Sequence, residues 1–132
     1  MENPRFNVDH RMIDGWTALH YASMNGFANI VELLVKEGDA NVNEMDRFQR
    51  NALHWACRFN SLRLIEKLLQ LKCRYEMKDI EQQTPLDICR IYHHDEAEDF
   101  LSDFIKERKK EEERKKKLKK QKEMQELAKK EK

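Results

Sequence analysis

The side chains of this sequence that could carry out chemistry are its histidines and cysteines. The candidates are His20, His54, Cys57, Cys73, Cys89, His93 and His94. Cys57 follows His54 by three residues, but a structural zinc site needs four ligands, and no further ligand follows at a metal-binding spacing. A phosphate-binding glycine loop, a nucleophile elbow and an H-E-x-x-H pattern are also missing. We therefore expect no catalytic residue, no metal site and no cofactor, and predict that the chain is not an enzyme.

His20 and His54 occupy the same place in a segment that recurs along the chain. The copies lie at 14–43, 49–76 and 82–104. Leu19 aligns with Leu53 at a spacing of 34 residues, and Leu53 aligns with Leu86 at a spacing of 33 residues. A period in the low thirties is typical of a stack of small supersecondary units.

Each copy has the pattern of two short helices joined by a turn. In the first copy Thr17 can cap a helix N-terminus, and Gly26 can end that helix in a left-handed conformation. The second helix carries an apolar stripe formed by Ile30, Val31, Leu33 and Leu34. Gly38 ends it. Two such helices cannot bury their apolar faces alone, whereas stacked copies can.

The repeated motif resembles the ankyrin repeat over about residues 8–105. The first copy reads Thr17-Ala18-Leu19-His20-Tyr21-Ala22, then Gly26, Ile30-Val31-Glu32-Leu33-Leu34, Gly38 and Asn43. The second reads Asn51-Ala52-Leu53-His54-Trp55-Ala56, and the third, which is degraded, reads Thr84-Pro85-Leu86-Asp87-Ile88-Cys89. Asn60 and Lys72 replace the two glycines of the second copy. Because lysine does not suit a positive φ, we expect the turn at Lys72 to be reshaped.

The resemblance implies an all-α, ankyrin-type solenoid of stacked helix-turn-helix repeats. We place an extended segment at 1–13 and the repeat domain at 14–105, with repeats at about 14–46, 47–79 and 80–105. The resemblance also implies that His20 and His54 bond backbone groups of neighbouring turns. It further implies that the turn tips and inner helices form a concave surface for protein binding. The protein-binding residues expected there are Trp16, Tyr21, Met24, Phe48, Gln49, Arg50, Trp55, Arg58, Phe59, Gln82 and Gln83.

These residues have competing interpretations. Trp55 and Tyr21 can equally be packing residues between neighbouring helices. Trp16 and Phe48, which lie in turns, have less structural reason to be large, and we favour a contact role for them. Apolar residues of the first helix pair, including Ile30, leave either a small tolerated surface or one that a partner covers.

Charge divides the chain into an acidic and a basic part. Residues 106–132 contain 14 Lys or Arg and 7 Glu, whereas 1–105 contain 12 basic and 18 acidic residues. No apolar run is long enough to span a membrane, and the N-terminus does not resemble a signal peptide. Three cysteines at no disulfide-framework spacing favour a reducing compartment. We expect a cytoplasmic protein, with cytoskeletal or nuclear association open.

The basic part predicts one long helix that begins near Asp95 and runs almost to the end, because strong helix formers follow Ile105 without Gly or Pro. The residues of this tail expected to bind an acidic surface are Arg114, Lys115, Lys116, Lys117, Lys119, Lys120 and Lys122. Three interpretations stay open for this tail at 106–132: a solvated helix without a target, a helix that docks on an acidic surface, or a nuclear-localisation signal.

Together these features predict a non-enzymatic adaptor or small structural subunit of a larger assembly. The concave face would bind one protein partner, and the basic helix would bind a second, acidic surface such as a filament. The alternative is an RNA- or ribonucleoprotein-associated subunit anchored by the tail. A regulator that blocks an enzyme's active site with its turn tips is a third hypothesis. We expect neither membrane nor small-molecule partners.

Overall fold

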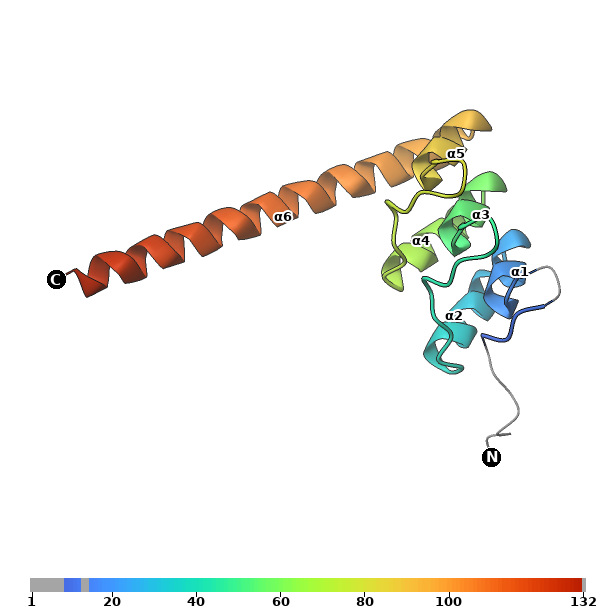
Figure 1. Ribbon diagram of the computed structural model, residues 1–132. Helices are drawn as coiled ribbons and strands as arrows, with labels where there is room; N and C mark the ends of the chain where they lie inside the picture. Colours follow the sequence, from blue (N-terminus) through green and yellow to red (C-terminus); the bar gives the residue numbers. More distant parts are fainter. Residues whose placement is uncertain (1–8, 13–14, 132) are drawn as a thin grey trace. The chain divides into compact units, whose positions relative to one another are not determined.

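The computed structural model describes residues 9–12 and 15–131, and these residues form α-helices without a strand (Figure 1). The helices are α1 (Ala18–Met24), α2 (Ala28–Lys36), α3 (Ala52–Arg58), α4 (Leu62–Gln70), α5 (Pro85–Ile91) and α6 (Asp95–Lys130). The all-helical fold and the long C-terminal helix that the sequence predicts are thus confirmed. Of the expected extended segment 1–13, residues 1–8 and 13 lie outside the described residues.

The first helix of each repeat begins with the same capping arrangement. Thr17, Asn51 and Thr84 have extended backbones, and their side chains accept a hydrogen bond from the N–H three residues later. In return, the side chain at that later position (a histidine in the first two repeats and Asp87 in the third) accepts from the capping residue's own N–H. This reciprocal pair satisfies two backbone donors that a helix start leaves unbonded.

The same helices end in a left-handed residue. Gly26, Asn60 and His93 have φ values of 71°, 56° and 56°. Lys72 also has a positive φ, of 69°. The expectation that lysine would reshape this turn is therefore wrong. The bonds from the Lys72 and Cys73 N–H groups to Leu69 and Leu68 carbonyls outweigh the modest steric cost of a left-handed lysine.

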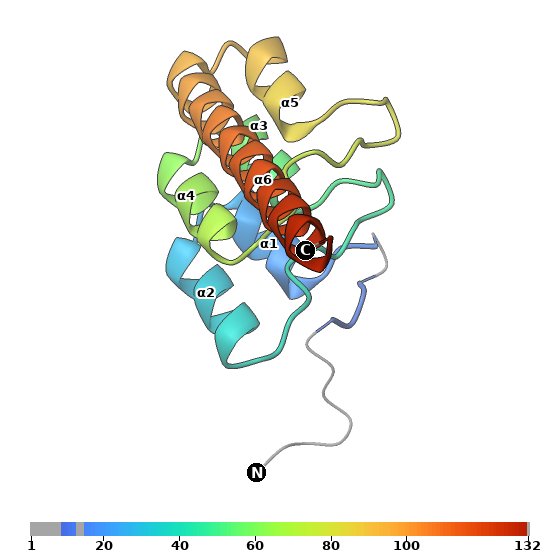
Figure 2. The same cartoon turned by 90° about the vertical axis from the view of Figure 1, so that its left-hand side faces the viewer.

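The helices form two layers. The inner helices α1, α3 and α5 contact one another in a row, whereas the outer helices α2 and α4 pack on each other and on their own inner partners (Figures 1 and 2). The largest fully buried apolar side chains are Leu19, Leu53, Leu64, Ile65, Leu68, Ile88 and Leu101. Those of the outer helices and α6 lie at the repeat positions of Ile30, Val31 and Leu34, whereas Ile30 and Leu33 of the predicted apolar stripe are themselves exposed.

The long helix α6 belongs to two structural units. The chain divides into Met1–Leu101 and Ser102–Lys132. In the first unit Ala97 and Leu101 are buried, so the beginning of α6 completes the third repeat. In the second unit, every side chain at 106–131 is exposed. No helix in the described part of the chain is long and apolar enough to cross a membrane.

Candidate functional site

Two aspartates fix the turns that precede the second and third repeats. Asp46 Oδ1 accepts hydrogen bonds from the N–H groups of Phe48 (2.8 Å) and Arg50 (3.0 Å). Thirty-three residues later, Asp79 Oδ1 accepts from Glu81 and Gln83, both at 2.9 Å. Both carboxylates are buried. Each turn tip is therefore held by its own side-chain acceptor.

The second oxygen of Asp46 joins two tryptophans from neighbouring repeats. The indole Nε1–H groups of Trp16 and Trp55 donate to Asp46 Oδ2 at 2.9 and 2.8 Å. The two rings meet edge to face, with centroids 5.9 Å apart. Trp55 is buried and Trp16 is half-buried. Both tryptophans thus help to hold the turn, in addition to any role in binding.

Further aromatic rings extend this pair on both sides. Tyr21 packs edge to face on Trp16 at 5.7 Å, and Phe59 stacks on Trp55 at 6.2 Å with an interplanar angle of 14°. Tyr21 and Phe59 are exposed. The rings of Tyr21, Trp16, Trp55 and Phe59 therefore form a continuous row across the first two repeats.

Two arginines lie over this row. The Arg50 guanidinium carbon lies 5.2 Å from the Trp55 ring centroid, and Arg50 Nε donates to Asp79 Oδ2 at 3.1 Å. Arg58 lies 5.1 Å from the Phe59 centroid and 3.8 Å from that of Tyr92. Cation–π contacts thus help to hold both side chains in place over the rings.

We call this surface the aromatic–arginine face. Its residues are Trp16, Tyr21, Phe48, Arg50, Trp55, Arg58, Phe59 and Tyr92. All except Tyr92 are expected from the sequence. Tyr92 is missed although it follows Phe59 by 33 residues, the repeat period. Asp46 and Asp79 are also separated by the repeat period, and the sequence analysis did not predict them either.

The remaining expected residues lie outside these contacts. Gln49 and Gln82 are exposed at the turn tips with positive φ values of 57° and 64°. Met24 is half-buried in α1. Gln83 is also half-buried, and its backbone carbonyl accepts a hydrogen bond from His54 Nε2 at 3.0 Å.

The two motif histidines tie each repeat to the next turn. His20 Nδ1 accepts from the Thr17 N–H at 3.1 Å, so its Nε2–H donates to the Glu44 carbonyl at 2.9 Å. His54 makes the equivalent bonds with the Asn51 N–H and the Gln83 carbonyl. Burial lowers the pKa of both imidazoles, because it disfavours the charged form. Their role here is structural, as the repeat resemblance implies.

The lowered pKa values of these two histidines predict that acid destabilises the domain. In the unfolded chain a histidine has a pKa near 6.5, so below this pH the unfolded state binds more protons than the folded state. Stability is thus fully present above about pH 6.5 and falls below it, by up to about 1.4 kcal/mol per pH unit for each histidine. Urea unfolding at pH 7.5, 6.5 and 5.5 measures this slope.

A matched pair of variants tests whether the buried histidines cause this pH dependence of stability. His54→Gln keeps a capping-box side chain and is expected to halve the slope. His10→Gln, at an exposed histidine, is expected to leave it unchanged. A wild-type free energy of unfolding that stays constant between pH 6.5 and 5.5 contradicts the prediction.

The cysteines are buried and free. The thiols of Cys57 and Cys89 contact each other across α3 and α5, and burial raises the pKa of the Cys57 thiol. Burial raises the pKa of Cys73 to about 12. His94 Nε2 donates to the Arg58 carbonyl at 3.0 Å. Among the described residues, no three His, Cys, Asp or Glu side chains gather where they could hold a metal ion.

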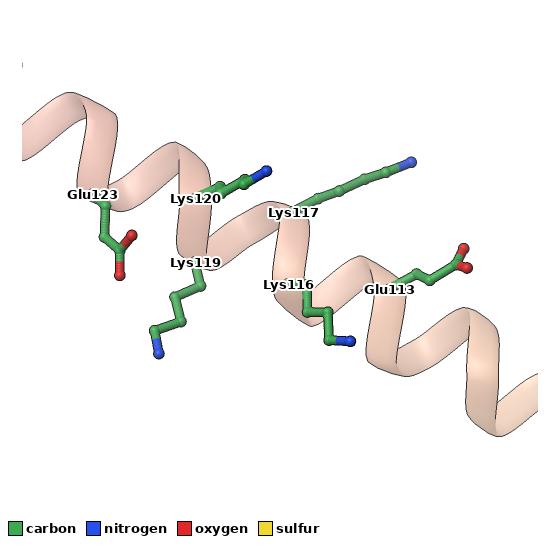
Figure 3. Close-up of a pocket in the computed structure, with 6 residues that line it drawn as sticks. All are labelled: Glu113, Lys116, Lys117, Lys119, Lys120 and Glu123. Atoms are coloured by element: carbon green, nitrogen blue, oxygen red, sulfur yellow. The ribbon is translucent and has the colours of Figure 1, made fainter.

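The basic tail presents its lysines from one helix. Glu113, Lys116, Lys117, Lys119, Lys120 and Glu123 border an open depression along α6 (Figure 3). In this view Lys117 and Lys120 extend to one side of the helix, and Lys116 and Lys119 extend to another. Four of the lysines expected from the sequence are thus close together along one stretch of α6.

Comparison with known proteins places the repeats in a family. A family profile described as ankyrin repeats, in three copies, matches residues 2–79. The chain is 34% identical to Neurogenic locus notch homolog protein 1 of Xenopus tropicalis over 86 residues, which cover 65% of this chain and 3% of that protein.

Two further relatives show similar identity. Human inversin is 35% identical over 74 residues, covering 56% of this chain and 7% of inversin. A putative ankyrin repeat protein of Rickettsia bellii is 29% identical over 90 residues, covering 67% of this chain and 50% of that protein. The chain thus spans half or less of the length of each of these relatives. From the family match and the repeat geometry together, the chain belongs to the ankyrin repeat family.

Proposed function

We propose that this chain is an adaptor or small structural subunit that binds one protein partner through the aromatic–arginine face and a second, acidic surface through its basic tail. Ankyrin repeats are generally protein-interaction modules and are typically non-catalytic. The observation that carries the proposal is the row of rings and arginines held in place by Asp46 and Asp79. Aromatic and arginine side chains dominate binding energy at interfaces, and preorganisation lowers the entropy cost of binding.

A photo-crosslinking experiment on the full-length chain can identify the partner. A photoreactive residue in place of Gln82, which is exposed at a turn tip next to the face, is expected to capture the partner in cells. The same residue in place of Glu66, which is exposed on the outer helix α4, serves as the control. Equal capture at both positions argues against binding at the inner face.

Removing two exposed rings is expected to weaken partner binding strongly without unfolding the domain. Phe48 and Phe59 are exposed members of the aromatic–arginine face. Truncation of an anchor residue costs about 2 kcal/mol, which is roughly a thirtyfold loss of affinity. We expect at least this loss for Phe48→Ala with Phe59→Ala, measured by calorimetry with the captured partner. Phe100→Ala, an exposed ring of α6 outside the face, is expected to bind normally.

The second candidate function, RNA binding, is supported by the exposed lysines of the tail. Changing Lys116, Lys117, Lys119 and Lys120 to glutamine separates this function from docking on an acidic protein. With single-stranded RNA as the probe, each lost phosphate contact is expected to reduce the slope of log K against log salt by about 0.7. Fluorescence anisotropy between low and physiological salt gives the slope.

The control removes two positive charges nearer the helix end. Lys129→Gln with Lys130→Gln lies outside the depression of Figure 3 and is expected to change the slope less. If RNA binds the four-lysine variant as well as it binds the wild type, the RNA hypothesis is wrong. The adaptor proposal then requires that the variant lose an acidic protein partner.

A further inference from the structure

The side chain of Arg58 contacts two exposed rings where the second repeat meets the third. Arg58 is the last residue of α3, and Phe59 follows it directly. The Arg58 guanidinium carbon lies 5.1 Å from the Phe59 ring centroid and 3.8 Å from that of Tyr92, which caps the C-terminus of α5. Phe59 and Tyr92 are 47% and 41% exposed. One cation thus joins exposed aromatic side chains from two repeats.

The third repeat holds both the backbone and the side chain of this arginine. His94 Nε2 donates a hydrogen bond to the Arg58 backbone carbonyl at 3.0 Å. The His94 ring also stacks on Tyr92, with centroids 6.3 Å apart and an interplanar angle of 22°. Tyr92 in turn contacts the guanidinium. The position of the charged group is therefore set before a ligand arrives, which lowers the entropy cost of binding one.

The two arginines of the aromatic–arginine face differ in their counterions. Arg50 Nε pairs with the buried Asp79 carboxylate at 3.1 Å. Among the described residues, no Asp or Glu forms an ion pair with Arg58, although its side chain is half-buried. Arginine side chains are seldom withdrawn from water without an anionic partner. Arg58 is therefore the cation of this face whose charge the domain itself does not compensate.

The net charge of the domain makes this cation selective. Residues 1–105 contain 12 basic and 18 acidic residues, so the domain as a whole repels acidic molecules. An acidic segment gains from this domain only where a basic group is fixed and uncompensated. Arg58 provides such a group in the middle of exposed rings.

The geometry around Arg58 favours a carboxylate over a nucleobase. A guanidinium is planar, and its N–H groups match the two oxygens of a carboxylate in a bidentate pair. A nucleobase needs a ring on which it can stack. Phe59 already stacks on Trp55, Tyr92 already stacks on His94, and both rings also contact Arg58. Apolar side chains beside a carboxylate suit the parts of these rings that stay exposed.

We propose that Arg58 determines the specificity of the partner site by binding a carboxylate. The partner segment then carries Asp or Glu next to an apolar or aromatic side chain. Its carboxylate pairs with the Arg58 guanidinium, and the neighbouring side chain packs on Phe59 or Tyr92. Packing there excludes water from the ion pair and strengthens it. This inference rests on the proposed function, because it names the chemistry of the partner that the aromatic–arginine face binds.

Selection from a library of random short peptides by the full-length chain tests this proposal. Peptides that also bind the Phe48→Ala, Phe59→Ala variant are discarded, because this variant keeps the basic tail and so removes acidic peptides that bind there. We expect the remaining peptides to be enriched in Asp or Glu next to an apolar or aromatic residue. For such a peptide, Arg58→Glu is expected to reduce affinity at least about thirtyfold. Replacing the acidic residue of the peptide with lysine is expected to recover most of this loss.

Two further variants serve as controls. Arg63→Glu makes the same change in net charge at an arginine that is exposed on the outer helix α4. It is expected to change affinity by no more than about twofold, because salt screens a distant exposed charge. Arg58→Lys keeps the charge without the planar fork, and is expected to bind the same acidic peptides more weakly. Urea unfolding of each variant shows whether the domain stays folded.

The possible outcomes separate this inference from the proposed function. Selected peptides without acidic enrichment, or with equal affinity for the wild type and Arg58→Glu, overturn the inference and leave binding by the face intact. Single-stranded RNA that binds the wild type but not the Phe48→Ala, Phe59→Ala variant also overturns it. If no peptide distinguishes the wild type from that double variant, the face is not a peptide-binding surface, and both proposals are wrong.

Discussion

Replacing Asp46 with alanine is expected to lower the free energy of unfolding by about 3 kcal/mol, because one buried carboxylate holds four donors. Its oxygens accept from two indoles and two backbone N–H groups. Alanine leaves these donors without an acceptor in a buried place. In the described part of the native chain, no buried side-chain nitrogen or oxygen lacks a hydrogen-bond partner, so the variant introduces a defect that the native domain avoids.

Urea unfolding followed by tryptophan fluorescence measures this loss, because Trp16 and Trp55 both donate hydrogen bonds to the Asp46 carboxylate. Asp39→Asn, at an exposed carboxylate with a φ of 57° that asparagine tolerates, is the control and is expected to change stability by less than about 0.5 kcal/mol. A loss below 1 kcal/mol for Asp46→Ala would mean that water replaces the carboxylate.

Asp46→Asn separates the two parts of the site. Asparagine keeps one oxygen that can serve the Phe48 and Arg50 N–H groups, but its amide N–H₂ then points donors at the donors of two indoles. We expect a stability between those of the wild type and the alanine variant. The turn should persist while the tryptophan emission shifts, because the indoles lose their acceptor.

Truncating Leu101 is expected to cost about 3 kcal/mol, since Leu→Ala at a fully buried site removes apolar contacts and leaves a cavity. Leu101 is fully buried near the start of α6. Leu118 lies in the same helix and is exposed, so Leu118→Ala has the same change in helix propensity without the cavity. We expect it to change stability by less than about 0.5 kcal/mol.

Thermal and urea unfolding of the two variants measures this difference. It also tests whether the beginning of α6 is part of the repeat domain. If both substitutions have the same small effect, α6 contributes nothing to the core, and α5 is the only helix of the third repeat that packs on the stack. A large effect for Leu101→Ala confirms that the degraded third repeat still closes the stack.

The sequence was sufficient to predict features that depend on local chemistry. Thr17 caps α1, Gly26 ends it, and strong helix formers after Ile105 carry α6 to Lys130. Each of these follows from interactions within a few residues, or from a pattern with the helix period. The repeat period extended the local predictions to the whole stack, because each repeat contacts mainly its neighbours.

Contacts between repeats were harder to predict from the sequence. Asp46 lies 30 residues from Trp16 and 9 from Trp55, and no local rule indicates that one carboxylate serves both indoles. Consequently Trp16, which its place in a turn marks as a contact residue, also has a structural role. A Trp16→Ala test of binding would therefore confuse lost affinity with lost stability, whereas the exposed Phe48 and Phe59 avoid this problem.

The buried thiols give the domain built-in reporters of its own motion. Thiolates rather than thiols react with alkylating agents, and Cys57 and Cys89 are shielded where α3 packs on α5. Labelling at these sites therefore requires that the inner helices part. The rate at which iodoacetamide consumes them in the unmodified protein measures how often the second and third repeats separate, and a bound partner that bridges both repeats should slow that rate.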